Sequence, residues 1–292
     1  MRNPLTPKFI FKNGKMESHV CPQISIYVVP EFQNHVPLPI SVDDVEPIQL
    51  TSELLLDPIF GYNNYSEFVQ GRSKLDVNRP LKEGAEGFPG GKVPSDSQIA
   101  WNDYHTFMNN AVEEVEERFS RGLLIDIHGH GHSENYIELG YVLSSETLTR
   151  STDALNSDPK IPASSSIRTL YNRKQSSLSF AELLRGKTTS LGGRLQSYGY
   201  DTLPSHVHKH PLVHERYFHG GYSVQKYGSR HGEQVIDAIQ IELPRSLRLG
   251  NKEVKDKFII DFAESLSWFV KEYYWKGGQG SKRLTIDVPT SN

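Results

Sequence analysis

An amphipathic segment followed at once by a continuous apolar run most constrains the fold. Within residues 97–119 the helical spacing is kept by Ile99, Tyr104, Phe107, Met108, Ala111, Val112, Val115 and Phe119. Asp96 is the expected N-cap of this helix and Gly122 its expected stop. The run LLIDI at 123–127 is typical of a strand that is buried on both faces. A helix that leads into a buried strand predicts an α/β layered core.

Four further segments outline the rest of the chain. Residues 24–29 and 235–243 have the β-branched pattern of strands. Residues 252–275 predict an amphipathic helix whose inner face carries Val254, Phe258, Phe262, Leu266, Phe269 and Tyr273. Residues 144–179 are dense in Ser, Thr, Asn and Pro, which predicts loops and a candidate lid, with a short helix at 180–185. No repeat or linker divides the chain, so we expect one domain over residues 1–292.

Composition excludes several classes of partner and compartment. The chain has 292 residues and a formal charge of -3, from 32 Lys plus Arg against 35 Asp plus Glu, so no broad basic surface favours nucleic acid or anionic lipid. Cys21 is the single cysteine, so no internal disulfide forms. No apolar run reaches the roughly 20 residues of a membrane helix. These features predict a soluble cytoplasmic protein that binds neither nucleic acid nor membrane; its oligomeric state is left open.

Three histidines follow the predicted buried strand in the stretch DIHGHGH at 126–132. Imidazole is a common zinc ligand, and the glycines between the histidines let the backbone turn sharply. Ligands of α/β sheets gather at such strand ends. Asp126 is a candidate for the carboxylate that orients a ligand histidine. The alternative is a histidine-rich surface turn, but a buried strand that leads into it favours the functional interpretation.

Asn78 and Arg79 end a predicted strand edge at residues 74–79. A forked guanidinium there suits a substrate carboxylate or a developing oxyanion. An exposed, ion-paired turn explains the same residues, and from these residues alone it is the stronger interpretation.

Glu242 is an acid near the end of an otherwise apolar strand, and Gln240 shares its side of that strand. Burial of a lone carboxylate requires a partner, a metal or a raised pKa, and each of these suits a general base. A structural salt bridge with Arg245 or Arg248 is the equal alternative. For His105, His206, His208, His210, His214 and His219 we favour structural or solvated roles, with His219 also a candidate for substrate contact.

Six short segments occur in one order along residues 72–248: KLDVNR (74–79), YH (104–105), DIHGHGH (126–132), ELGY (138–141), YFHGGY (217–222) and QIELPR (240–245). Together they resemble the N-formylglutamate amidohydrolase family. The resemblance implies a zinc carboxypeptidase-like fold, in which helices flank a mixed, largely parallel sheet. It also implies one zinc ion, held by two residues of an early segment and one later histidine.

Carried over by position, the resemblance assigns a role to each matching residue. His128 matches the later zinc ligand, and Glu242 matches the carboxylate that moves protons. Asn78 and Arg79 match the pair that faces the substrate, with Arg79 in a catalytic role. Further expected substrate contacts are His130, His219 and Arg245.

The implied function is hydrolysis of an N-formyl or N-acyl amide bond in a small carboxylate-bearing substrate such as N-formylglutamate. The alternatives are a non-catalytic relative that binds a small acid or peptide, and a carboxypeptidase that acts on peptide C-termini. The chain departs from the family in its first 70 residues, which lack the early Pro-His-Gly motif. Candidates for the early ligands are Glu31, His35, Glu46 and Glu53.

Overall fold

The computed structural model of the chain describes residues 24–28, 75–85, 95–119, 121–232 and 234–275. Its centre is a mixed five-stranded sheet with the strand order β1-β2-β5-β3-β4. The strands are β1 (Ile24–Val28), β2 (Gly122–Gly129), β3 (Ile137–Gly140), β4 (Thr202–Leu203) and β5 (Ile236–Leu243). β2 runs parallel to β5 and β3 parallel to β4, whereas β1 lies antiparallel to β2 and β3 antiparallel to β5. The predicted α/β class and mixed sheet are confirmed.

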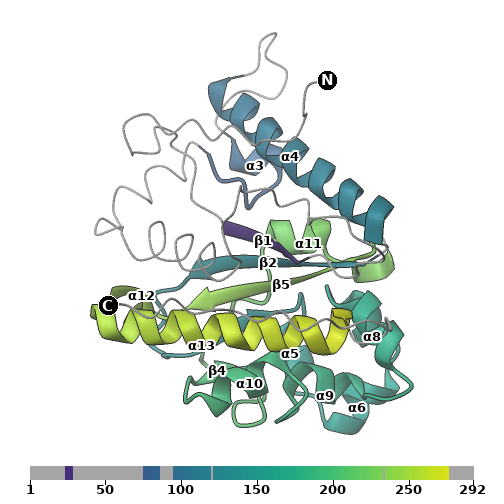
Figure 1. Cartoon of the computed structure of the whole chain (residues 1–292), viewed down its shortest axis with the longest axis vertical. Helices are drawn as coiled ribbons and strands as arrows, with labels where there is room; N and C mark the ends of the chain where they lie inside the picture. Colours follow the sequence, from purple (N-terminus) through teal and green to yellow (C-terminus); the bar gives the residue numbers. More distant parts are fainter. Residues whose placement is uncertain (1–23, 29–74, 86–94, 120, 233, 276–292) are drawn as a thin grey trace, which may run out of the picture.

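Helices cover both faces of this sheet, so β2 and β5 are buried on both sides (Figure 1). On one face, α4 (Asp96–Phe119) and α11 (Tyr222–Tyr227) pack on Leu124, Ile236 and Ala238. On the other face lies the larger core, to which α13 (Lys252–Val270) contributes. Side chains alternate between the faces along a strand, so the odd-numbered apolar residues of β2 and β5 enter this larger core: Leu123, Ile125, Ile127, Ile239, Ile241 and Leu243.

The prediction of loops for residues 144–179 is wrong. Four short helices lie there: α5 (Ser145–Leu148), α6 (Thr152–Ser157), α7 (Lys160–Ser164) and α8 (Arg168–Lys174). Ser144 and Ser151 cap two of them, each accepting a hydrogen bond from a backbone N–H three residues on. Each of the four helices buries an apolar residue in the larger core: Leu148, Leu155, Ile161 and Leu170. The segment is therefore part of the core and not a lid.

The remaining helices agree more closely with the sequence. α9 (Phe180–Arg185) has its predicted bounds, and α10 (Leu191–Ser197) and α12 (Arg245–Leu249) accompany it. α13 and the π-helical turn Lys271–Trp275 together span the predicted C-terminal helix. Its inner face is as predicted except for Val254, which is 42% exposed.

The start of α4 differs from the prediction. α4 begins at Asp96, and Ser95 takes the cap position. The Ser95 hydroxyl accepts a hydrogen bond from the Gln98 N–H, and the Gln98 side chain accepts one from the Ser95 N–H. Gly122 opens β2 instead of ending the helix, which stops at Phe119.

Residues 75–85 form a turn that packs against α4, where the sequence predicted a strand edge. Leu75 makes an isolated bridge with Ala85, and α3 (Leu81–Gly84) lies between them. Leu75, Val77 and Ala85 pack with Trp101 of α4 in a small cluster. This turn carries Asn78 toward the sheet, where its side chain meets His128 of β2.

Candidate functional site

The α4-covered face of the sheet changes from apolar to polar at the carboxyl ends of β2 and β5. Strand register places Asp126 beside Gln240, and His128 beside Glu242. Glu138 of β3 lies directly opposite Glu242 on its other side, so the three strands present a row of His128, Glu242 and Glu138 on one face. The same edge therefore gathers charged side chains from three strands.

The histidine-rich loop crosses this edge. The loop after β2 must pass the end of β5 to reach β3, because β5 lies between them. His130 N–H accordingly donates to the carbonyl of Leu243 at the end of β5, at 3.1 Å. The loop thus brings His130 and His132 next to the row of charged side chains at the strand ends.

The three acids of the site are buried: Asp126 and Glu138 are 0% exposed and Glu242 is 6% exposed. Within the described residues, neither carboxylate oxygen of Asp126 accepts a hydrogen bond, and neither does Oε2 of Glu242. A buried carboxylate whose oxygens accept no hydrogen bond carries a large desolvation cost. This arrangement is typical of a site that binds a cation or transfers a proton.

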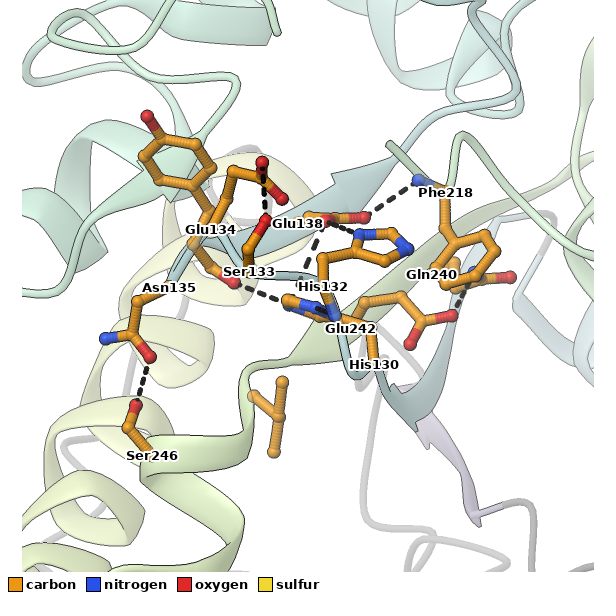
Figure 2. Close-up of polar contacts among 12 residues, drawn as sticks. His130, His132, Ser133, Glu134, Asn135, Glu138, Phe218, Gln240, Glu242 and Ser246 are labelled. Atoms are coloured by element: carbon orange, nitrogen blue, oxygen red, sulfur yellow. Dashed lines mark hydrogen bonds and ion pairs between the residues drawn. The ribbon is translucent and has the colours of Figure 1, made fainter. Parts of the chain in front are cut away.

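Glu242 has the properties expected of a group that exchanges protons. The pKa of Glu242 is raised to about 7: burial is the main cause, His128 opposes the rise, the nearby carboxylates Glu138 and Asp126 add to it, and Arg248 opposes it. The Gln240 side-chain N–H donates to Glu242 Oε1 at 2.9 Å, and Figure 2 shows the two side chains beside the histidines. The predicted sharing of one strand side by Gln240 and Glu242 is confirmed.

His130, His132 and Glu138 form a group that could hold a metal ion, with one ligand atom from each lying within 4.8 Å of the others. The ring of His132 donates from Nδ1 to Glu138 Oε1 at 2.7 Å, and the Phe218 N–H donates to Glu138 Oε2 at 2.8 Å (Figure 2). The Phe218 ring packs against His132 at a tilt of 32°, with ring centroids 4.6 Å apart. Both oxygens of Glu138 are therefore satisfied, unlike those of Asp126.

The hydrogen bonds of His130 fix its tautomer. Its Nε2–H donates to the Tyr136 carbonyl at 2.8 Å, because a carbonyl only accepts, while its Nδ1 accepts from the His132 N–H at 3.2 Å. Burial lowers the pKa of His130, which agrees with a neutral ring. To bind a metal, His130 must give up its hydrogen bond to the Tyr136 carbonyl or the one from the His132 N–H. Neutral His132, in contrast, keeps a lone pair on Nε2 that is available to a metal.

His128, the expected zinc ligand, lies next to this group and not within it. Its Nε2 is 3.0 Å from Asp126 Oδ1 and 3.5 Å from the Asn78 side-chain nitrogen. Asn78 also accepts a hydrogen bond from the Ser223 N–H of α11 at 2.9 Å. This bond holds the turn before α3 in place next to His128. Asn78 is therefore placed at the site, as predicted.

Arg79, Arg245 and His219 lie farther out than predicted. Arg79 is 58% exposed at its side chain and pairs with Asp76 at 3.3 Å, which is the ion-paired turn that we gave as the alternative. Arg245 is exposed at the start of α12, and the His219 side chain is exposed while its backbone carbonyl accepts from Val142 N–H. Arg248 is the arginine of α12 that reaches the site, where it donates to the carbonyls of Leu243 at 3.1 Å and His130 at 2.7 Å.

Sequence reasoning gave no role to Glu138, although a signal was present. Glu138 is a lone acid in the buried strand sequence IELG, which is the same pattern that singled out Glu242. The strand has four residues, so its pattern is too short to stand out from the surrounding loop. The early candidates Glu31, His35, Glu46 and Glu53 lie outside the described residues.

Comparison with known proteins found no relative: no family model, no curated protein and no solved structure matches the chain. Within the described residues, none of the helices has the length and apolar character needed to cross a membrane.

Proposed function

We propose that the chain is a metal-dependent hydrolase that cleaves an N-formyl or N-acyl amide bond in a small carboxylate-bearing substrate. One observation carries the proposal: three buried carboxylates and three histidines meet at one edge of the sheet, and both oxygens of Asp126 and Oε2 of Glu242 there have no hydrogen-bond partner among the described residues. A cation and a proton-transfer role account for such an arrangement. The zinc carboxypeptidase-like fold and the cytoplasmic location belong to the same proposal.

His130, His132 and Glu138 are the residues that fit a zinc ion, since two imidazoles and a carboxylate are a ligand set that catalytic zinc uses. The fit requires His130 to release the Tyr136 carbonyl or the His132 N–H. When bound, zinc supplies Lewis-acid polarisation of the scissile carbonyl and of a water molecule. His128 lies beside this group, 3.0 Å from Asp126, and is left outside this set of ligands.

Glu242 would accept the proton of the attacking water and pass it to the leaving nitrogen. Its pKa of about 7 suits both steps, because a base with a pKa near the working pH takes up and releases a proton with little cost. The Gln240 donor fixes one oxygen of Glu242, which leaves Oε2 to face the substrate.

Arg79 would hold the carboxylate of the substrate. It follows Asn78, which touches His128, and its exposed guanidinium pairs with Asp76 at 3.3 Å and with Glu83 at 4.0 Å. A bidentate contact with a substrate carboxylate would replace the pair with Asp76. N-formylglutamate is the example that the sequence resemblance suggests.

The test is hydrolysis of a panel of N-formyl and N-acyl amino acids by the zinc-loaded chain and by Glu242→Gln. We expect turnover by the parent and a loss of about 100-fold or more in kcat for the variant, the scale of one general-base contribution, with metal retained. Glu253→Gln, on the first turn of α13, is the matched control and should match the parent. A variant that hydrolyses the panel as fast as the parent contradicts the role of Glu242. A zinc-loaded parent that binds these compounds without cleaving them favours the non-catalytic alternative.

A further inference from the structure

We propose that Asp126 and His128 hold a second divalent cation, beside the one that the proposed function places at His130, His132 and Glu138. The inference deepens the proposed function and rests on it, since it makes the site a two-metal centre. Two-metal hydrolases use the pair of cations to stabilise both the attacking and the leaving atoms.

Asp126 gives the first reason. Its side chain is 0% exposed, and neither oxygen accepts a hydrogen bond within the part of the chain that the structure describes. Glu138, on the same sheet face, shows the usual solution, because both of its oxygens are hydrogen-bonded. Asp126 is therefore a buried carboxyl group whose oxygens accept no hydrogen bond from the described residues and which lies 3.0 Å from the His128 ring, and a cation between the two would satisfy it.

The contact between Asp126 and His128 gives the second reason. Oδ1 and the ring Nε2 are 3.0 Å apart, yet Oδ1 accepts no hydrogen bond, so the two atoms are close without an N–H directed between them. Two ligands at about 2.0–2.2 Å from one cation, at angles between octahedral and tetrahedral, lie roughly 3.0–3.5 Å apart. The observed separation is that of two ligands of one ion.

The place of Glu242 gives the third reason. It lies on β5 between His128 of β2 and Glu138 of β3, in direct register with both. Its Oε2 is a buried oxygen without a hydrogen-bond partner among the described residues. Glu242 Oε2 therefore lies on the strand between the two proposed groups and keeps its proton-transfer role. A carboxylate with an imidazole favours a cation such as Zn²⁺ or Mn²⁺.

The rival arrangement is a protonated His128 that pairs with Asp126 and needs no cation. The two arrangements are distinguished by metal stoichiometry. The full chain is freed of metal by chelation, dialysed to equilibrium against Zn²⁺, and its bound zinc is counted by elemental mass spectrometry. The variants are Asp126→Asn and His132→Ala. The control is Asp201→Asn, which alters another Asp–His contact, the 3.2 Å pair with His208.

We expect two zinc ions per parent chain, one in Asp126→Asn, one in His132→Ala and two in Asp201→Asn. If the parent binds one ion, and Asp126→Asn keeps this ion while His132→Ala loses it, the second cation site is overturned and the proposed function stands. If the parent binds one ion and only Asp126→Asn loses it, the cation site at Asp126 is supported. The metal site at His130, His132 and Glu138 in the proposed function is then overturned. A parent that binds no zinc overturns both.

A second measurement needs no metal and also shows whether Asp126→Asn folds. In the metal-free state, the amide replaces a buried charge without hydrogen-bond partners, so we expect the thermal midpoint of Asp126→Asn to exceed that of the parent. The rival arrangement predicts a lower midpoint, because the variant would break a buried ion pair. A lower midpoint therefore overturns the proposal.

Discussion

Asp126 and Glu138 lie on the same face of one sheet and have the same charge and burial, yet their surroundings differ. Glu138 receives hydrogen bonds from His132 and Phe218, whereas Asp126 receives none from the described residues. The difference is the reason why we propose a cation beside Asp126, where the His128 ring lies 3.0 Å from Oδ1. It also explains why residue identity alone cannot assign roles: both acids occur in buried strands, and only their neighbours separate a satisfied acid from an unsatisfied one.

Gln240 links two parts of the site. Its Nε2 donates to Glu242 Oε1, and its Oε1 accepts from the Gly221 N–H at the start of α11. We predict that Gln240→Leu destabilises the protein by about 1–3 kcal/mol, because the change removes both hydrogen bonds of a buried group. Urea unfolding of the full chain measures the effect. Gln175→Leu changes an exposed glutamine and should have a much smaller effect; equal effects would refute the linking role.

Individual site residues were predicted from the sequence where a single signal was strong. Glu242 and the histidine stretch were identified because charge next to a buried strand is costly. Arg245 was preferred to Arg248 because it lies in the matching segment, but the two residues lie three apart on α12 and only Arg248 reaches the His130 carbonyl. Which side of a short helix faces a site depends on tertiary packing, and no periodic pattern in five residues records it.

Long elements with a regular pattern were predicted well, and short ones were not. α4, β2, β5 and α13 each keep one periodicity over many residues. The four short helices of residues 144–179 each bury only one or two apolar side chains, and Ser144 and Ser151, which cap two of them, look like loop residues in the sequence. β3 and β4 have four and two residues, so their pairing depends on the sheet around them.

The capping pair of Ser95 and Gln98 fixes where α4 begins, and α4 carries Trp101 and His105 toward the turn that holds Asn78. We predict that Ser95→Ala lowers the free energy of unfolding by about 1 kcal/mol, the usual effect of losing an N-cap. Ser97→Ala, within the first turn of α4, is the control and should be close to neutral. Denaturant unfolding of both variants tests this, and equal stabilities would show that the cap contributes nothing.

At the scale of the whole molecule, His105 joins the turn at residues 75–79 to the two helices on its side of the sheet. Its ring binds the Val77 carbonyl at 3.0 Å and the Tyr227 hydroxyl at 2.6 Å, and packs on Trp101. The structural role expected for His105 is confirmed. The segment that carries Asn78 is thus held to α4 and α11 by a buried neutral imidazole.

This junction predicts a pH dependence of stability. Burial, and to a lesser degree the charge of Lys226, lower the pKa of His105 from its usual value of 6.5 to about 4. As the pH falls from about 6.5 to about 4, the unfolded chain binds a proton that the folded chain does not, so stability is lost over this window. We expect His105→Gln to lose less stability than the parent between pH 7 and pH 4 in thermal unfolding. Parallel declines in the two proteins would show that His105 does not contribute to the dependence.

The metal content of the purified full chain tests the central claim most directly. We expect at least one zinc ion per chain by elemental mass spectrometry, and a clear reduction in His132→Ala, because His132 belongs to the group that could hold the ion. A chain that contains no metal, and that binds none after reconstitution with zinc, would contradict a metal-dependent hydrolase at this site.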